Sequence, residues 1–335
     1  MTAESSPSSQ TLAPFLIEPR FDTRVWGFDD IRPWFDRTSK SAGGSGEPLA
    51  EAWLTGDDCR IASGPNKGKA LGEIFSASPR ALLGPPAPKA ESPLLIKVIF
   101  AREKLSVQVH PDDRLAQKYG DPRGKTECWY ALAAQPGAKV ALGLKPGASM
   151  DEVRSGILDG TLEQQLNIVS VDERDMIFVD AGTVHAIWPG SILLETQQNC
   201  DLTYRMFDYG RPRELHIDKS LEATRLATRA GKVAPIERDD RTILIDVEYF
   251  RVERIPVNGV RDSSSLAASE EPGPGLAYLF AAAGSARLSG EGIEPIEIQP
   301  RGMVCIPASS PSFTIEDLGD LDLIRMSPRW PASTT

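Results

Sequence analysis

Short runs of β-branched and apolar residues, each bounded by Gly, Pro or Asp, recur along most of the chain. Runs of this kind are typical of β-strands, and their regular turn signals are typical of an all-β barrel or sandwich. The pattern therefore predicts a mainly β fold. The expected strands are 51–55, 94–100, 105–110, 127–133, 139–144, 176–179 and 191–196, followed by 243–248, 250–254, 276–281, 294–298 and 322–326.

Two stretches interrupt the strand pattern with apolar residues spaced as on one face of a helix. In the stretch 149–169 these residues are Val153, Ile157, Leu158, Leu162 and Leu166, and Ser149 or Asp151 could cap the start. In the stretch 214–230 they are Leu215, Ile217, Leu221 and Leu226, set among charged residues. We therefore expect two helical insertions in an elaborated barrel.

Length and local composition divide the chain into parts. A chain of 335 residues is too long for one small core. The segment 229–241 is polar and charged with one proline, as in an inter-domain connection. We predict a disordered N-terminal tail at 1–13, a larger β domain at 14–240 and a smaller second β domain at 241–335.

The charge of the chain limits its partners. A net charge of -10 argues against nucleic acid or an anionic membrane as the main partner. No apolar run reaches the roughly 18 residues that span a bilayer, and the small, polar N-terminal stretch does not resemble a signal peptide. We expect a cytoplasmic protein, in which a phosphorylated substrate would need a local basic pocket.

Cysteine usage excludes two classes of site. The four cysteines are widely spaced and form no CxxC pair; they are Cys59, Cys128, Cys200 and Cys305. Neither a disulfide framework nor a cysteine-type zinc site is expected from this spacing. We predict four reduced thiols in or near cores.

The first of the three histidines ends a strand-like segment at 105–110. Alternation sends the aliphatic residues 105, 107 and 109 to one face, and Ser106, Gln108 and His110 to the other. A glutamine and a histidine opposite an aliphatic face are unusual for a packed core. If their face points into a barrel, both polar groups need partners, and a metal ion is one way to supply them.

Two further segments also place polar, potentially metal-binding residues on or beside predicted strands. In 124–130, strand alternation places Lys125, Glu127 and Trp129 on one face. A carboxylate beside an ammonium group inside a barrel has a shifted pKa, which makes it a candidate site residue. In 180–185 a strand ends, Gly182 permits a sharp turn, and His185 begins the next strand.

The candidates together form a mixed nitrogen and oxygen set: Gln108, His110, Glu127 and His185. Such a set suits Zn²⁺ with an open position for water or substrate, which is the catalytic arrangement. Each residue taken alone also has a structural or surface interpretation. Their joint placement in strand-like segments, each with a turn nearby, is what favours a metal site.

One more polar segment, 195–205, follows the last predicted strand of the first half. It has too many polar residues for a buried strand and is too irregular for a helix face. On pattern alone, an exposed edge strand is the alternative to a functional role.

At these residues the sequence closely resembles type I mannose-6-phosphate isomerases of the shorter bacterial form. The matching segments are 105–113 (LSVQVHPDD), 124–130 (GKTECWY), 180–186 (DAGTVHA), 195–211 (ETQQNCDLTYRMFDYGR) and 213–219 (RELHIDK), with further likeness at 24–27, 51–53 and 93–97. Several motifs in the right order make the match specific. The likeness runs from about residue 15 to residue 221, and the C-terminal part resembles the family only in length and β character.

The resemblance implies a cupin barrel with helical additions, followed by a second, metal-free, cupin-like barrel. It implies one Zn²⁺ per chain, held by Gln108, His110, Glu127 and His185. Strand geometry suggests the same four residues. The resemblance also implies that Arg205 is an active-site residue.

Two positions depart from the commoner family pattern. Cys128 stands where a bulkier apolar residue is usual, and Cys200 stands where a small hydroxyl residue is usual. Neither is an implied ligand, so these departures concern substrate packing rather than the chemistry. The third histidine, His216, fits a helix of the family and is given a structural role.

The implied activity is the interconversion of mannose 6-phosphate and fructose 6-phosphate through an enediol. Arg205 and Lys125 would supply positive charge for the phosphate or the enediolate. Lys97 is a weaker candidate, expected on a strand that adjoins the Gln108 strand. Glu195 and Asp201 are candidates for carrying the proton between C1 and C2, with a water molecule at the metal as the alternative.

Two other function classes fit the same residues. A cupin oxygenase would use Fe²⁺ and favour additional histidine ligands, whereas Gln108 and the charges of Lys125 and Arg205 favour a phosphosugar site. A sugar-phosphate-binding sensor would keep the pocket without turnover. We expect an isomerase whose partner is a small-molecule sugar phosphate, not nucleic acid or membrane, and which is a monomer or a small homo-oligomer.

Overall fold

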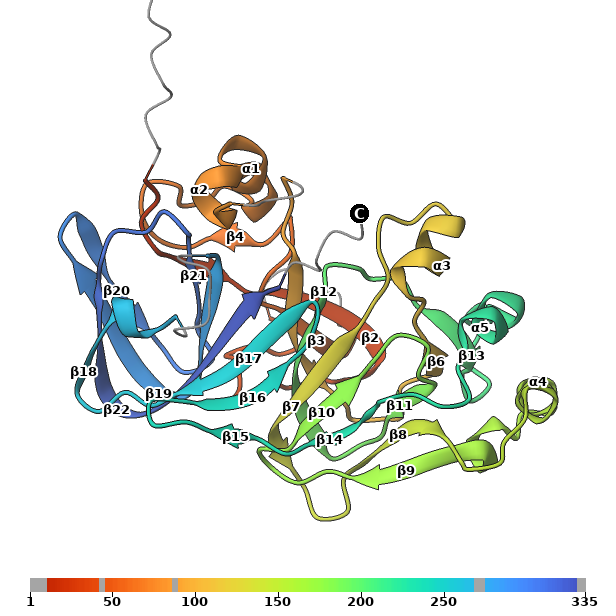
Figure 1. Cartoon of the computed structure of the whole chain (residues 1–335). Helices are drawn as coiled ribbons and strands as arrows, with labels where there is room; N and C mark the ends of the chain where they lie inside the picture. The colour runs from red at the N-terminus through yellow and green to blue at the C-terminus, as the bar shows by residue number, and fades with distance from the viewer. Residues whose placement is uncertain (1–10, 42–45, 86–89, 268–274, 330–335) are drawn as a thin grey trace, which may run out of the picture.

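The computed structural model describes residues 11–41, 46–85, 90–267 and 275–329. The predicted mainly β fold is confirmed, because strands dominate these residues and the helices are short. Figure 1 shows two β assemblies side by side, with α3, α4 and α5 beside one of them and α1 and α2 above the other. Within the described residues, every helix is too short or too polar to span a bilayer.

Two antiparallel sheets build the first assembly. The seven-stranded sheet has the order β14-β10-β7-β12-β5-β3-β2, with strands at Gly231–Val233, Met176–Val179, Glu127–Ala134, Ser191–Gln198, Leu94–Phe100, Leu49–Trp53 and Arg20–Phe28. The five-stranded sheet has the order β13-β6-β11-β8-β9, with strands at Tyr204–Phe207, Val107–Val109, His185–Ile187, Lys139–Leu144 and Leu166–Ser170. Both sheets contribute to one buried cluster, which includes Ile99, Trp129, Val140 and Ile187. They therefore enclose a common interior, as a barrel does.

The second assembly is a ten-stranded sheet of order β15-β16-β17-β22-β19-β21-β1-β4, with β18 paired to β22 and β20 to β19. Its C-terminal strands are Ile236–Glu237, Thr242–Asp246, Phe250–Ile255, Val260–Asp262, Ala277–Gly290, Ile293–Ile298, Met303–Ile306 and Thr314–Pro328, from β15 to β22. The sheet folds around its own apolar cluster, which includes Leu279, Leu288, Val304 and Leu323. Each assembly thus has a separate interior.

The two assemblies also share strands and core. The N-terminal strands β1 (Phe15–Glu18) and β4 (Arg60–Ile61) are hydrogen-bonded into the ten-stranded sheet through β21. The largest buried cluster combines Phe100 and Tyr130 of the first assembly with Phe250 and Tyr278 of the second. The chain therefore begins in the sheet that its C-terminal part completes.

The predicted N-terminal tail falls mostly on residues 1–10, which lie outside the described residues. The part of the tail prediction at 11–13 differs from the structure. Leu12 is buried, and its backbone N–H donates a hydrogen bond to Ser309 Oγ at 3.1 Å. Apolar packing against the second assembly accounts for the difference, because burying a leucine side chain stabilises the fold by about 1.5–3 kcal/mol.

Several predicted strands are confirmed without change, among them 94–100, 139–144 and 176–179. The apolar strand β5 is buried along its whole length. Leu94, Ile96 and Val98 pack into the core shared by the two assemblies, while Ile99 faces the barrel interior. Alternation therefore directs Lys97, the one charged residue of β5, into the barrel.

The exposed-edge alternative for the polar segment is wrong. Strand β12 lies between β7 and β5 in the seven-stranded sheet, and Glu195, Thr196, Gln197 and Gln198 are buried. The polar content is compatible with burial because Glu195, Gln197 and Gln198 each make at least one hydrogen bond through the side chain. Gln198, for example, accepts a hydrogen bond from the Thr126 N–H and donates one to Asp113 Oδ1, both at 2.9 Å.

Both helical insertions are shorter than predicted. Helix α4 spans Met150–Asp159, with Ser149 as its N-cap in a capping box with Glu152. It ends at Gly160, whose φ of 71° lies in the left-handed region. A 3₁₀ turn and strand β9 follow, so the predicted helix is wrong beyond Gly160. The second insertion contains only α5, Ile217–Ala223.

The remaining helices are α1 (Leu71–Ala77), α2 (Pro79–Leu83) and α3 (Asp113–Lys118), with 3₁₀ turns at Leu162–Gln165 and Ser263–Ser265. Helices α4 and α5 cover the outer face of β6. Val107 and Val109 pack there with Val153, Ile157 and Ala223 in one buried cluster. This packing fixes the outer face of β6, and so directs the alternate residue Gln108 inward.

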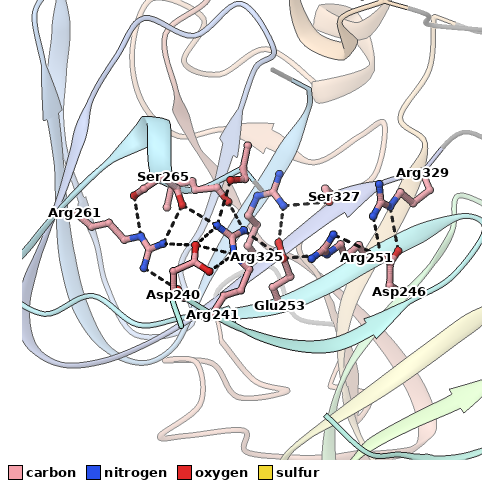
Figure 2. A network of polar contacts seen from close by, with 12 residues as sticks. Asp240, Arg241, Asp246, Arg251, Glu253, Arg261, Ser265, Arg325, Ser327 and Arg329 are labelled. Atoms are coloured by element: carbon pink, nitrogen blue, oxygen red, sulfur yellow. Dashed lines mark hydrogen bonds and ion pairs between the residues drawn. The ribbon is translucent and has the colours of Figure 1, made fainter. Parts of the chain in front are cut away.

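An ion-pair network lies inside the second assembly (Figure 2). The fully buried carboxylate of Glu253 contacts Arg241, Arg251 and Arg325 at 3.3, 3.0 and 2.6 Å. Arg241 also donates to Asp240 at 2.6 Å. Glu253 is therefore surrounded by guanidinium groups, each carried by a strand or turn of this assembly.

Candidate metal centre and adjoining cavity

Strand register brings three site residues into one row on the five-stranded sheet. His185 of β11 lies opposite Gln108 of β6, and Gln108 lies opposite Arg205 of β13. Directly opposite residues on neighbouring strands share a face. The turn before His185 has the expected geometry, because Gly182 adopts a φ of 89°.

A second row lies on the seven-stranded sheet. Lys97 of β5 is opposite Glu195 of β12, and Glu195 is opposite Trp129 of β7. The expectation that Lys97 lies on a strand adjoining that of Gln108 is wrong, because β5 and β6 belong to different sheets. Lys97 approaches the site from the facing wall of the barrel.

The two walls meet at a buried cluster of His110, Glu127 and His185, whose potential ligand atoms lie within 4.8 Å of one another. His110 Nε2 is 3.6 Å from Glu127 Oε2, and His185 Nε2 is 3.5 Å from Glu127 Oε1. These atoms converge on one point from separate strands and loops. Such a cluster could hold a metal ion.

Backbone carbonyls orient both imidazole rings. His110 Nδ1 donates to Leu202 O at 2.8 Å, and His185 Nδ1 donates to Thr183 O at 2.9 Å. With Nδ1 protonated, each neutral ring directs the Nε2 lone pair into the cluster, as is usual for metal-binding histidines. Burial lowers the pKa of His185 to about 4 and the pKa of His110 well below its usual range, with Lys125 adding to both effects. Both rings are therefore neutral at neutral pH.

Gln108 and Glu127 complete the donor set. The carboxamide nitrogen of Gln108 lies 3.2 Å from His185 Nε2, and a 180° flip of this amide would present its oxygen instead. Neither oxygen of the fully buried Glu127 accepts a hydrogen bond within the described part of the chain, although Lys125 Nζ lies 2.7 Å from Oε2. A divalent cation would supply the partner that these oxygens lack. The residues present therefore fit a metal ion.

A second carboxylate, Glu195, accompanies the cluster. It accepts a hydrogen bond from Trp129 Nε1 at 3.0 Å, and its Oε2 lies 3.1 Å from Lys97 Nζ and 3.9 Å from Lys125 Nζ. Burial raises the pKa of Glu195, but the two ammonium groups outweigh burial and lower it to about 2. Burial and the negative charge of Glu195 raise the pKa of Glu127 to about 8. The neighbouring carboxylates thus differ sharply in how readily they ionise without a metal.

A cavity of roughly 360 Å³ adjoins the cluster. Its lining includes five cationic residues, Arg24, Lys97, Lys125, Arg205 and Arg213, and three acidic ones, Glu51, Glu195 and Asp201. Gln108 also lines the cavity, so the candidate metal centre borders it. The cavity is the local basic pocket that a phosphorylated substrate would need in an acidic protein.

The structure brings the sequence-predicted site residues together around the cluster and the cavity. The predicted direction of one neighbouring side chain is wrong. Leu105, assigned to the aliphatic face, instead lines the cavity with Ser106, because β6 begins only at Val107. Asp201 also lines the cavity, and its more exposed carboxylate lies 4.0 Å from Lys97.

Arg205 is held in place by the segment that follows β13. Its Nη1 donates to Glu214 O at 2.9 Å, and its backbone N–H donates to His216 Nδ1 at 3.1 Å. His216 therefore anchors the backbone of Arg205. Burial lowers the pKa of Arg205, and the nearby charges of Arg213 and Arg24 lower it further.

Sequence reasoning missed Glu51, Arg24 and Arg213. Glu51 lies 3.4 Å from Lys97 and accepts a hydrogen bond from Trp53 Nε1 at 2.8 Å. All three belong to segments that resemble the known family, and this resemblance is the sequence signal that could have identified them. Charge alone did not distinguish them from surface residues, since tertiary packing brings them to the cavity.

Together, the barrel and its buried cluster define a β-barrel protein with a candidate metal site beside a cationic cavity. Residues 15–141 match the family described as phosphomannose isomerase type I, catalytic domain. The match includes Gln108, His110 and Glu127 and ends before His185.

Relatives extend the likeness over nearly the whole chain. The probable mannose-6-phosphate isomerase GmuF of Bacillus subtilis is 31% identical over 317 residues, which cover 90% of this chain and 96% of the relative. The crystal structure of the mannose 6-phosphate isomerase from Bacillus subtilis superposes with a TM-score of 0.81 at 30% identity, and covers 94% of this chain and 99% of that one. The chain belongs to the type I phosphomannose isomerase family.

A more distant structure shares the fold. It is described as mannose 6-phosphate isomerase bound with zinc and yttrium, and it superposes with a TM-score of 0.75 at 16% identity, covering 95% of this chain and all of that one (100%). This likeness shows the fold alone. The expected mainly β fold of the cupin type agrees with the fold of these neighbours.

Proposed function

We propose that this chain is a mannose-6-phosphate isomerase, which interconverts mannose 6-phosphate and fructose 6-phosphate through an enediol and uses one Zn²⁺ per chain. The observation that carries the proposal is the buried cluster of His110, Glu127 and His185 beside a cavity with five cationic residues. Membership of the isomerase family supports the reaction. The acidic net charge does not oppose a phosphorylated substrate, because the basic charge is concentrated at the cavity.

Gln108, His110, Glu127 and His185 would hold the ion. Neutral imidazoles with carboxylate and amide oxygens are a donor set that Zn²⁺ accepts with a position left open. The Glu127 oxygens, which accept no hydrogen bond in the described structure, support this assignment. When bound, Zn²⁺ would act as a Lewis acid toward the carbonyl and hydroxyl oxygens of the sugar.

Fixed cations would stabilise the negative charge of the substrate. Lys125 lies against Glu127 and His110, so its ammonium group is near the oxygens at C1 and C2 of a sugar bound there. Arg205 shares a face with Gln108 and would contact the enediolate or the phosphate. Lys97, held between Glu51 and Glu195, is a further substrate-binding residue of this proposal.

The proton transfer between C1 and C2 would be carried by an acidic residue of the cavity. Glu195 is held by Trp129 and Lys97 and has a pKa lowered to about 2, mainly because of Lys125 and Lys97 acting against burial. Because Trp129 contacts one oxygen of Glu195 and Lys97 contacts the other, we assign to Glu195 the positioning of the lysines. We assign the proton transfer to Asp201, whose more exposed carboxylate lines the cavity.

The same proposal covers the organisation and location of the chain. We propose a catalytic barrel within 14–240 and a second, metal-free barrel within 241–335, to which β1 and β4 contribute. A cytoplasmic location is supported by the cysteines, none of which is in a disulfide.

The test is a coupled assay that follows fructose 6-phosphate formed from mannose 6-phosphate by the purified protein. We expect turnover that a chelator removes and added Zn²⁺ restores. A protein that binds mannose 6-phosphate without converting it would instead be a sugar-phosphate sensor. Oxygen uptake with Fe²⁺ and no isomerisation would identify a cupin oxygenase and contradict the proposal.

A further inference from the structure

We propose that the phosphate group of the substrate is bound at the open side of the cavity by three arginines, so that Arg24 and Arg213 are substrate-binding residues together with Arg205. This inference rests on the isomerase function proposed above and specifies how its substrate is oriented. The phosphate lies among the guanidinium groups, and the reacting carbons C1 and C2 lie at the candidate metal centre.

The arginines come from the free edges of the two sheets that enclose the cavity. Arg24 belongs to β2, the last strand of the seven-stranded sheet, and Arg205 belongs to β13, the first strand of the five-stranded sheet. Arg213 lies in the segment that follows β13. All three line the same cavity, so arginines from the edges of both sheets reach the same space.

Exposure distinguishes the two ends of this cavity. The side chains of Lys97 and Lys125 are 5% and 4% exposed, whereas those of Arg24 and Arg213 are 36% and 28% exposed. The lysines therefore lie at the inner end, with the metal centre, and the arginines at the outer end. A doubly charged phosphate remains partly hydrated at the outer end, which lowers the cost of desolvating it.

The charges at the inner end are already matched. Lys97 contacts Glu51 and Glu195, and Lys125 contacts Glu127. Two of the arginines also have a carboxylate partner, Asp22 for Arg24 and Asp208 for Arg213. Neither of these aspartates lines the cavity. The outer end therefore presents three arginines and one exposed carboxylate, that of Asp201, to a ligand, and its net charge is positive.

Each guanidinium group is held from one side. Nε and Nη2 of Arg213 donate to the buried Asp208, both at 2.6 Å, which leaves Nη1 outside the pair. Arg205 donates through Nη1 to Glu214 O, and its buried Nε has no hydrogen-bond partner within the described residues. Arg24 donates through Nη1 to Thr23 O at 2.8 Å. Guanidinium groups fixed in this way are prepared to donate to phosphate oxygens.

The repulsion among the three arginines also favours an anion at the outer end of the cavity. Arg213 and Arg24 both act on Arg205 as unfavourable like charges. A cluster of like charges at an open cavity is stabilised by a bound anion. The cavity volume of roughly 360 Å³ is within the range of small-molecule sites, about 300–1,000 Å³.

Two measurements on Arg24→Gln and Arg213→Gln test the inference. The first is the KM and kcat for mannose 6-phosphate, and the second is the affinity for inorganic phosphate, measured by calorimetry on the full-length, metal-loaded protein. We expect each substitution to raise KM and to weaken phosphate binding by roughly tenfold to a hundredfold, as for the loss of a hydrogen bond to a charged group. We expect kcat to change much less, because the reacting carbons lie elsewhere.

Arg154→Gln is the matched control. It removes one arginine charge from α4, on a side chain that is 53% exposed, and we expect KM and phosphate affinity to stay at wild-type values. Thermal unfolding and metal content verify that each variant is folded. Wild-type KM and phosphate affinity in both Arg24→Gln and Arg213→Gln would overturn the inference. Arginine-dependent phosphate binding without any isomerase turnover would support this site and contradict the proposed function.

Discussion

Each of the two β assemblies holds a fully buried glutamate among basic residues, yet the two glutamates differ in how they are partnered. In the second assembly, Glu253 contacts three arginines at 3.3, 3.0 and 2.6 Å (Figure 2). In the first assembly, Glu127 contacts one lysine and accepts no hydrogen bond in the described structure, while two imidazole Nε2 atoms point toward it.

How a buried carboxylate is partnered distinguishes a structural polar core from a functional one. Buried polar groups in folded proteins are normally satisfied, so a carboxylate such as Glu253, whose two oxygens accept hydrogen bonds from Arg241 and Arg325, needs no ligand to explain it. Lys125 is the one ammonium group in contact with Glu127, through Oε2, and Glu127 Oε1 accepts no hydrogen bond in the described structure, so this cluster has room for a cation from outside the chain. The network of Glu253 therefore holds a barrel together, and the cluster of Glu127 is prepared for a ligand.

The largest effect is expected from His110→Ala. The substitution removes one of the converging donors, and we expect the bound metal to be lost and kcat/KM to fall by roughly a thousandfold or more, the scale of removing metal-based stabilisation worth several kcal/mol. Metal analysis and the isomerase assay measure the two losses. His216→Ala is the control for metal content, because His216 hydrogen-bonds to the backbone of Arg205 and lies outside the cluster. Full metal occupancy in His110→Ala would contradict the ligand assignment.

A large effect on stability alone is expected from Glu253→Gln. Losing the carboxylate leaves buried guanidinium groups uncompensated, which costs about 3–5 kcal/mol of unfolding free energy. Urea unfolding of the metal-free protein measures this cost, and kcat/KM per folded molecule should stay unchanged. Glu127→Gln, measured in the same way, should cost less stability without metal and should abolish activity. Equal stability losses in the two variants would remove the contrast between the two cores.

Arg205→Ala should lower kcat/KM by about a hundredfold to a thousandfold, the scale of removing one fixed electrostatic contact, because Arg205 lies opposite Gln108 and also belongs to the proposed phosphate site. Because Arg205 is not among the proposed ligands, the metal content should remain near one ion per chain. Metal analysis of the variant together with its steady-state kinetics makes the distinction. Turnover at the wild-type rate would exclude Arg205 from the mechanism.

The smallest effect is expected from Trp129→Phe. It removes the hydrogen bond to Glu195 at 3.0 Å but leaves the contact between Lys97 and Glu195. Loss of a hydrogen bond to a charged group is worth about 1.5–3 kcal/mol at most, so kcat/KM should fall by no more than roughly a hundredfold with the metal retained. A complete loss of activity would show that Glu195 has a more direct role than positioning.

Local patterns predicted much of the fold and the direction of the key side chains. Strict alternation in β6 placed Gln108 on the inner face, opposite the buried Val107 and Val109, as the structure has it. The segment 124–130 behaves in the same way, with Lys125 and Glu127 in contact. Alternation succeeds there because one face of each strand packs against a dense apolar cluster.

The stretch after Gly160 shows where periodicity fails. Leu162 and Leu166 have helical spacing, yet they belong to a 3₁₀ turn and to the start of β9. Both residues are buried against the helices α4 and α5 in one cluster, so tertiary packing decides their conformation. A short apolar pattern does not distinguish these alternatives.

Residues brought together by distant strands were also beyond local reasoning. The pairing of β1 with β21 joins residues near the two ends of the chain, Phe15 with Cys305. Arg24 and Arg213 reach the same cavity from opposite sheet edges. No spacing along the chain encodes such contacts, because they arise from register between segments far apart in sequence.

The most direct test is a titration of the metal-free protein with Zn²⁺. Calorimetry measures the binding, and isomerase activity is measured after each addition. Convergence of four side chains on one ion predicts that binding saturates at one equivalent and that activity rises in step with it. Full activity in the presence of a strong chelator, with no Zn²⁺ taken up, would contradict the account.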